Sequence, residues 1–330
     1  MPLRHPGLPR HHAGAQEALR PHYPTLRLLT MNEPTRLDWH AEAIREQLVP
    51  LLPGLSVEVL HRTVSTNTTL LERARLMSDP RQDAAGAVVR RSVESGAFGR
   101  RAVDLQPSLL VAEHQIGGRG RQGRPWQSAP GASLTFSLGL PLSASSWSGL
   151  SLAVGVALCE ALSSPRSDGP QLGLKWPNDL WLMDGPLQTA AHGRKLGGIL
   201  IETIAAGAQR LVIVGIGLNV LSFAVAEAKT GFASLSEIDP DATAPTTLAR
   251  LVAPLVHALR QFERDGFVAF GARFAAVDLL YGRKVRTTAA DAPEGTARGV
   301  NAEGALQVKS ATGMTSILSG EVTVRLAHDA

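Results

Sequence analysis

Gly117-Gly118-Arg119-Gly120-Arg121-Gln122-Gly123-Arg124-Pro125-Trp126 follows an apolar run at 108–114 that is typical of a strand. Within it, Gly118, Gly120 and Gly123 match the G-x-G-x-x-G pattern. In a dinucleotide-binding fold that pattern opens a helix, and an acidic residue follows about 20 positions later. Here prolines and a strand-like run at 133–140 follow, and Glu160 is the first acidic residue. The stretch is therefore a loop between strands, and a dinucleotide-binding fold is excluded.

The loop nevertheless has the composition of an anion-binding segment. Its glycines allow main-chain amides to come close to a ligand, and Arg119, Arg121 and Arg124 offer charge-assisted hydrogen bonds to phosphate or carboxylate. A solvated arginine loop without a ligand is the alternative, and Trp126 could equally be a core residue. Composition alone leaves both interpretations open.

The pattern around this loop predicts an α+β fold. Strands and helices are mixed rather than alternating, which favours a mixed sheet with helices on one side. We expect strands at 55–63, 108–114, 133–140, 181–183, 196–203 and 211–216, and helices at 38–48, 66–77, 149–162 and within 247–280.

The residue composition and pattern of the chain change near both ends, so we expect three parts. Residues 1–35 form a basic, proline-rich leader predicted to be disordered, and 36–280 form the main domain. Residues 281–330 hold short strands separated by turns, which predicts a small β-barrel. The stretches 79–105 and 184–193 are interpreted as insertions or long loops. Met31 is a candidate for the true start.

Composition and charge exclude several classes of protein. The chain has 330 residues, 44% of them hydrophobic, with a single cysteine that rules out an internal disulfide. Three of its four net positive charges lie in residues 1–30, so a broad nucleic-acid-binding face is not expected. The charge-free stretch 125–159 is broken by prolines, and its helical part is too short to span a bilayer. No histidine or cysteine has metal-ligand spacing, so no metal site is predicted.

A second motif, Lys175-Trp176-Pro177-Asn178-Asp179, stands among apolar residues. The chain has only five lysines, so Lys175, and Lys195 beside its own apolar run, are candidates for a compact positive charge that meets an anion at low dielectric. The alternative is an edge-of-strand lysine paired with Asp179 or Glu202. Two weaker signals are Ser65-Thr66-Asn67 at a helix start and Gly215-Ile216-Gly217-Leu218-Asn219 at a strand end.

Taken in order, these segments resemble the biotin–protein ligases, also called biotin–[acetyl-CoA-carboxylase] ligases. The resemblance runs from about residue 56 to 326 and includes Ala112-Glu113-His114-Gln115 and Arg194-Lys195-Leu196-Gly197-Gly198-Ile199-Leu200. It implies a class II synthetase-like core with an SH3-like terminal domain. It also implies a two-step reaction with MgATP, in which biotin is activated as biotinyl-5'-AMP and then transferred to a carrier-protein lysine.

The resemblance assigns a role to each matching residue. Ser65, Thr66, Asn67 and Gln115 would line the biotin pocket. Arg119, Gly120 and Arg121 would close over biotin and the adenylate, and Lys195 would contact biotin and the phosphate. Asp179 would orient the incoming lysine or accept its proton. The residues expected on the nucleotide side are Arg121, Trp126, Lys175, Asn178, Lys195 and Asn219.

Three other functions remain as alternatives. A lipoate–protein ligase would share the fold and chemistry, because the choice of acid depends on the shape of the pocket. A biotin-responsive regulator would bind DNA with a steep salt dependence, which the near-neutral core disfavours. A non-enzymatic binding module would not need Lys195.

The partners expected are the biotin carboxyl carrier protein of acetyl-CoA carboxylase, no nucleic acid and no membrane. We expect a cytoplasmic enzyme without a winged-helix DNA-binding domain, and an exposed strand edge leaves a homodimer open.

Overall fold

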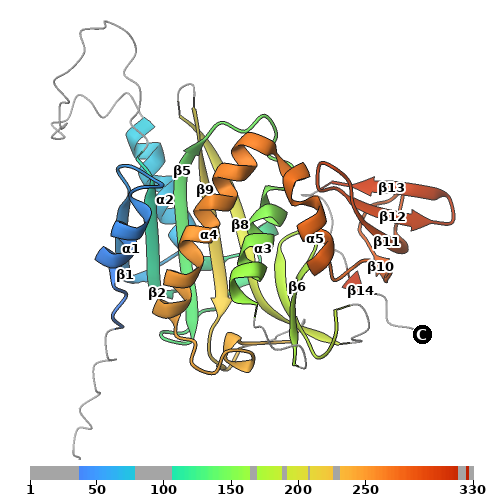
Figure 1. Cartoon of the computed structure of the whole chain (residues 1–330), viewed down its shortest axis with the longest axis horizontal. Coiled ribbons are helices and arrows are strands. Elements are labelled where there is room, and N and C mark those ends of the chain that lie inside the picture. The colour runs from blue at the N-terminus through green and yellow to red at the C-terminus, as the bar shows by residue number, and fades with distance from the viewer. Residues whose placement is uncertain are drawn as a thin grey trace, which may run out of the picture. The chain divides into compact units, whose positions relative to one another are not determined.

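The computed structural model describes residues 37–78, 106–163, 169–187, 192–206, 209–225, 231–318 and 325–326. Figure 1 shows the chain from the first helix to the last strand. The expected leader at 1–35 and the expected insertion at 79–105 lie outside the described residues, as does part of 184–193.

A seven-stranded mixed sheet forms the centre of the molecule, with the order β1-β2-β5-β9-β8-β7-β6. Only β1 and β2 run parallel, and every other neighbouring pair is antiparallel. Strands rich in branched apolar residues suit this buried position. The strands are β1 (Ser56–Thr63), β2 (Ser108–Gln115), β5 (Ser133–Leu142), β6 (Gln171–Lys175), β7 (Asp179–Met183), β8 (Gly193–Ala206) and β9 (Gln209–Asn219).

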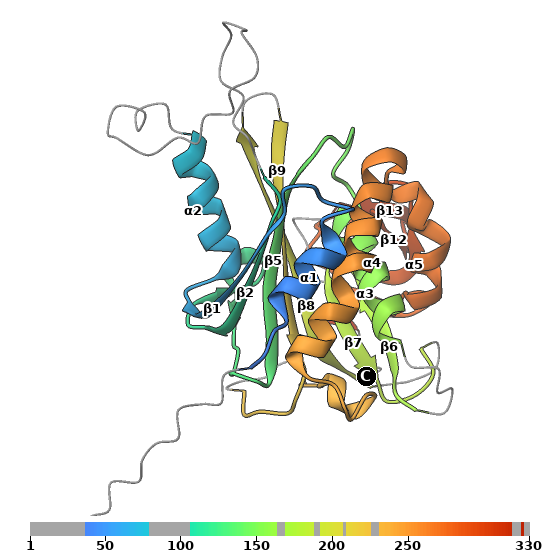
Figure 2. The ribbon, with the colours of Figure 1, turned by 60° about the vertical axis from the view of Figure 1, so that its left-hand side comes forward.

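Most of the helices cover one face of this sheet, as Figure 2 shows. They are α1 (Ala41–Leu48), α3 (Leu150–Leu162), α4 (Ala244–Asp265) and α5 (Gly271–Val277). Helix α3 is apolar on nearly every side because α4, α5 and the strands β6 and β8 pack around it, and ten of its thirteen residues are buried. No described helix combines the length and apolar character that a bilayer crossing requires.

Helix α2 (Thr66–Ser78) departs from the expectation of helices on one side only. It packs on the opposite face, where Leu70, Leu71 and Ala74 form a separate small core with Leu110 and Ile213. The mixed sheet with helices is confirmed, but the position of α2 was predicted wrongly. Its leucines mark a buried face in the sequence without indicating which side of the sheet they meet.

The helical zone expected at 247–280 is divided by Gly266. Helix α4 begins after the N-cap Thr243, whose hydroxyl accepts a hydrogen bond from Thr246 N, and ends at Gly266, which has φ 66°. A short 3₁₀ turn at Phe267–Phe270 then leads into α5. A side chain at Gly266 would be strained by this left-handed conformation, so the break is specified locally.

The C-terminal part forms a second, five-stranded antiparallel sheet with the order β13-β12-β11-β10-β14. This agrees with the small terminal β-domain expected, although among the described residues β13 and β14 are edges and no pairing closes the sheet into a barrel. Its strands are β10 (Lys284–Arg286), β11 (Glu294–Val300), β12 (Leu306–Ser310), β13 (Gly313–Ile317) and β14 (Arg325–Leu326).

Candidate functional site

The glycine–arginine loop folds into a small hairpin beside the end of β2. Strand β3 (Gly118–Arg119) pairs with β4 (Pro125–Trp126), and Gly120 N donates to Arg124 O over 2.7 Å. Between them the chain turns through Gln122 at φ 55° and Gly123 at φ 70°. No helix follows, as the prolines predict, so the arginines lie on a returning loop rather than on a phosphate-binding helix end.

The sheet face behind this hairpin carries polar side chains in place of apolar ones. In β5, Ser133, Thr135 and Ser137 are buried and alternate with Leu134 and Phe136, which face the main core. This period-two pattern marks one polar face of a buried strand. We did not single out these residues from the sequence, although the alternation in 133–140 would have found them.

Three of the predicted biotin-pocket residues meet in one buried network on this face. Gln115 Oε1 accepts hydrogen bonds from the Thr66 amide at 2.7 Å and the Thr66 hydroxyl at 3.1 Å. The Ser137 hydroxyl lies 2.6 Å from both Thr66 Oγ1 and Asn67 Oδ1. The Asn67 side chain also donates to Leu200 O at 3.1 Å. The network therefore joins the start of α2 to strands β2, β5 and β8.

Ser65 is buried at the same helix start and supports it locally. Its carbonyl accepts the Thr69 amide at 2.9 Å and the Thr69 hydroxyl at 3.0 Å. The side chain lies at the cap of α2, with its hydroxyl 3.5 Å from Thr68 N. The start of α2 is thus fixed by its own backbone and by the neighbouring strands.

Arg119 lies beside this network and contacts Glu202, which the sequence suggests only as an alternative partner of a lysine. Its guanidinium donates to Thr68 Oγ1 at 3.0 Å and lies 3.5 Å from Glu202 Oε1. The other oxygen of Glu202 accepts a hydrogen bond from Asn67 at 2.9 Å. Glu202 therefore joins the arginine loop to the buried network, a relationship that only the pairing of distant segments creates.

Arg121 reaches across to the second motif. Its Nη1 donates to Asn178 Oδ1 at 3.3 Å, while Asn178 Nδ2 donates to Ile199 O at 2.7 Å. Burial lowers the pKa of the Arg121 guanidinium, and the nearby Asp179 carboxylate opposes that shift. A partly desolvated cation held by one neutral amide is well suited to take up an anion.

Lys195 and Asp179 form an ion pair on the same face of the sheet. The Nζ atom of Lys195 lies 2.7 Å from Asp179 Oδ1, and 28% and 24% of the two side chains are exposed. A Cβ atom built on Gly198 would lie 3.4 Å from the carboxylate and 3.5 Å from the ammonium. Lys195 therefore pairs with Asp179, as the alternative interpretation of the sequence expects. The pair also lies on the same face of the sheet as the polar network.

Trp126 lies over the glycine strand β9. A Cβ atom on Gly217 would come within 2.8 Å of three indole atoms, and one on Gly215 would come within 3.0 Å of the Asn67 amide. Both glycines are needed because side chains from the opposite segments rest directly on the strand. The Trp126 indole N–H is buried and has no hydrogen-bond partner among the described residues.

Two residues expected on the nucleotide side have other contacts. The ammonium of Lys175 lies 4.3 Å from the centroid of the Trp181 ring. The buried side chain of Asn219 donates to Ala233 O at 2.9 Å and to Lys195 O at 3.4 Å, so it fixes the backbone next to Lys195.

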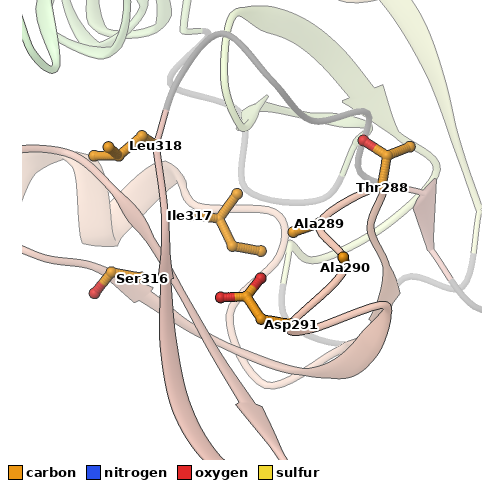
Figure 3. Close-up of a pocket in the computed structure, with 7 residues that line it drawn as sticks. All are labelled: Thr288, Ala289, Ala290, Asp291, Ser316, Ile317 and Leu318. Atoms are coloured by element: carbon orange, nitrogen blue, oxygen red, sulfur yellow. The ribbon is translucent and has the colours of Figure 1, made fainter.

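Two hollows are described here, one beside this site and one away from it. One of about 380 Å³ is bordered by residues 114–118 and 125–128, at the base of the arginine hairpin next to Gln115. The other, of about 280 Å³, is in the C-terminal sheet and is drawn in Figure 3, where Asp291 and Ile317 point toward one another. None of the residues predicted for the site line the second hollow.

The arrangement as a whole gathers cations around the polar face of the sheet. Arg119 and Arg121 come from the hairpin, Lys195 comes from β8, and all three lie around one face of the sheet. Among the described residues, no group of three or more histidines, cysteines, aspartates and glutamates could hold a metal ion. The site can neutralise a carboxylate and a phosphate together and hold a neutral polar group deeper in the pocket.

Two family models match the chain. The Biotin/lipoate A/B protein ligase family matches residues 104–219, and the Biotin protein ligase C terminal domain matches residues 282–325. The first match spans the arginine loop, the Asn178 turn and Lys195, and the second spans nearly all of the small C-terminal sheet.

Curated proteins and solved structures of similar sequence have related names. The chain is 31% identical over 289 residues to the bifunctional ligase/repressor BirA of Escherichia coli, covering 86% of this chain and 78% of that protein. It is 30% identical over 302 residues to the biotin--[acetyl-CoA-carboxylase] ligase of Mycobacterium tuberculosis, covering 86% and 94%. The biotin protein ligase of Aquifex aeolicus, solved with biotin and ATP, aligns with a TM-score of 0.59 at 25% identity, over 82% of this chain and 99% of that one.

Proposed function

The chain belongs to the biotin protein ligase family, and we propose that it joins biotin to a lysine of a carrier protein at the expense of ATP. The carrier is the biotin carboxyl carrier protein of acetyl-CoA carboxylase, as the name of the mycobacterial relative suggests. The enzyme works in the cytoplasm. ATP enters as its magnesium complex, in which phosphate oxygens and water molecules are ligands to the metal.

The convergence of Arg119, Arg121 and Lys195 around the polar face of the sheet is the observation that carries this proposal. A carboxylate and an anionic α-phosphate repel one another, so their reaction needs cations at both groups. Each of the three cations is held here by an oxygen acceptor that an incoming phosphate or carboxylate can replace.

In the first step, a carboxylate oxygen of biotin attacks the α-phosphorus of ATP, and pyrophosphate leaves. Lys195 and Arg121 stabilise the negative charge that develops on the phosphate oxygens, and Arg119 draws the biotin carboxylate toward them. No residue needs to form a covalent intermediate, because positioning and charge neutralisation suffice. The product is biotinyl-5'-AMP, a mixed anhydride.

In the second step, the amine of the carrier lysine attacks the carbonyl carbon of biotinyl-5'-AMP, the amide bond forms and AMP leaves. Asp179 lies next to Lys195 and accepts the proton that the attacking amine loses. Arg121 and Gly120 keep the loop over the adenylate, which limits attack by water.

The deeper part of the pocket recognises the polar ring of biotin. Ser65, Thr66, Asn67 and Gln115 supply hydroxyl and amide groups, and Ser137 completes their network. Gln115 Oε1 and Ser137 Oγ are already engaged within this network, so a ligand that binds to them exchanges some of these hydrogen bonds for its own. The Trp126 ring covers the glycine strand and offers an apolar wall to the carbon chain of the acid.

The test is pyrophosphate release from MgATP with biotin or lipoate added separately, with and without a biotin carrier domain. We expect release with biotin, and a mass gain on the carrier lysine that requires both ATP and biotin. Pyrophosphate release with lipoate alone would show that the enzyme is a lipoate–protein ligase instead. No release with either acid would contradict the proposal.

A further inference from the structure

The indole of Trp176 joins the two sheets of the molecule. Trp176 lies in the turn between β6 and β7, only 1% of it is exposed, and its Nε1 donates to Gly304 O over 3.0 Å. Gly304 belongs to the C-terminal sheet, between β11 and β12. A hydrogen bond this deeply buried fixes the position of both partners, since neither can find water instead.

The Gly304 side of this contact is rigid. Asn301 Oδ1 accepts hydrogen bonds from Glu303 N at 3.1 Å and Ala305 N at 2.8 Å, which closes the turn on itself. Gly304 has φ 77°, and a Cβ atom there would lie 2.8 Å from the Gly149 Cα at the start of α3. The turn therefore sits directly against the main domain and presents its carbonyl to Trp176.

The turn that carries Trp176 leads straight to the site. Pro177 O accepts the Ser151 hydroxyl at 3.0 Å, so the turn is fastened from the α3 side as well. The next residue, Asn178, exchanges backbone and side-chain hydrogen bonds with Ile199 and accepts Arg121 Nη1. Movement of the Trp176 ring would therefore move the amide that holds Arg121.

We infer that Trp176 is a positioning residue through which the C-terminal sheet holds Asn178, and thereby Arg121, in place over the adenylate. The inference rests on the proposed function, because it is Arg121 of the closing loop that retains the adenylate. The path runs from Gly304 to the Trp176 indole, along the chain through Pro177 to Asn178, and from the Asn178 side chain to Arg121. The C-terminal sheet thus contributes to retention of the intermediate without touching it.

The experiment compares two tryptophan variants of the full-length protein that lose the same atoms. Trp176→Phe removes an indole N–H that bonds Gly304 O, whereas Trp181→Phe removes a buried N–H with no hydrogen-bond partner among the described residues. The measurement is the rate at which labelled biotinyl-adenylate leaves the enzyme. We expect release to be roughly fivefold faster in Trp176→Phe, the effect of one lost hydrogen bond, and little changed in Trp181→Phe.

A second comparison separates positioning from general loosening of the fold. In an Arg121→Ala background, Trp176→Phe should add nothing, because the residue through which it acts is absent. Equal release rates in the two tryptophan variants would overturn the inference, as would an undiminished effect of Trp176→Phe in the Arg121→Ala background.

Gly304→Ala tests the contact from the other side. Its Cβ atom meets backbone at Gly149, so we expect the same faster release as in Trp176→Phe, and no further increase when the two are combined. Additive effects would contradict a shared route. Failure of the wild-type protein to form any adenylate would overturn the proposed function itself, and this is seen before any variant is compared.

Discussion

Lys195 Nζ lies 2.7 Å from Asp179 Oδ1, so that the ends of strands β7 and β8 present an ammonium and a carboxylate side by side on the ligand face. The pair is about one quarter exposed, and a small anion can reach the lysine from the open side. The two members of the pair are expected to serve different steps, which makes them separable by mutation.

Lys195→Met should abolish most of the first step. The substitution keeps the length of the side chain and removes the charge that stabilises the reacting phosphate, so we expect the rate of pyrophosphate release to fall by about 10²–10³-fold. The measurement is biotin-dependent pyrophosphate release at saturating MgATP. A rate within threefold of wild type would contradict the role of Lys195.

Asp179→Asn should act mainly on the second step. The amide cannot accept the proton of the attacking lysine, so transfer from preformed biotinyl-adenylate to the carrier domain should slow by about 10²-fold. Pyrophosphate release in a single turnover should change much less. An equal loss in both steps would show instead that Asp179 serves only to hold Lys195.

Arg121→Gly should release the adenylate prematurely. The loss of the Arg121–Asn178 contact and of the positive charge opens the loop, so labelled adenylate should no longer stay with the protein during gel filtration. Arg124→Gly is the matched control, because Arg124 is in the same hairpin but contacts Gln122 at the exposed tip. Unchanged retention of labelled adenylate by Arg121→Gly would contradict this prediction.

Ser137→Ala should weaken biotin binding. The hydroxyl connects Thr66 and Asn67 within a buried network, and its loss leaves Asn67 Oδ1 without this hydrogen-bond partner. We expect the KM for biotin to rise about tenfold and the free energy of unfolding to fall by about 1–3 kcal/mol. Ser133→Ala, on the same face of the strand, loses a hydrogen bond to Ala129 N and should lower stability without changing this KM.

Asp278 should make the stability of the fold depend on pH. Burial raises the pKa of its carboxyl from 3.8 to about 6, and Oδ2 has no hydrogen-bond partner among the described residues. Because the folded state holds this proton more tightly than the unfolded state, the proton adds to the free energy of unfolding below about pH 4. This stabilisation amounts to about 3 kcal/mol and is lost as the pH rises through 6.

Asp278→Asn isolates this contribution, because the asparagine side chain stays neutral and its oxygen can still accept the hydrogen bond from Leu280 N. In urea unfolding, the variant should gain stability over wild type as the pH rises from 4 to 7. A difference between variant and wild type that stays constant over this range would contradict the prediction.

The sequence was sufficient for features that depend on local patterns. The strands at 108–114, 133–140 and 211–216 were predicted within a few residues, and prolines after the glycine loop excluded a helix there. Strand β6 was missed because it has only five residues, among them a glycine and two polar residues at its ends. Local pattern carries little information about so short an element.

The sequence alone does not predict contacts between segments that are distant along the chain. Glu202 contacts Arg119 and Asn67 only because the hairpin and α2 both reach the same face of β8. For the same reason the side of the sheet covered by α2 was predicted wrongly. The roles assigned to Lys175 and Asn219 came from the resemblance, and the contacts of these residues do not by themselves indicate nucleotide binding.

Helix α2 has one further consequence, for where the chain tolerates change in length. Its first turn carries the residues of the buried network, and its last residue, Ser78, is about 18 Å further along the helix axis. The chain thus leaves α2 at the end remote from the pocket. We therefore expect the connection from α2 to β2 to tolerate changes in its length, so that a reporter peptide inserted after Ser78 leaves catalysis intact.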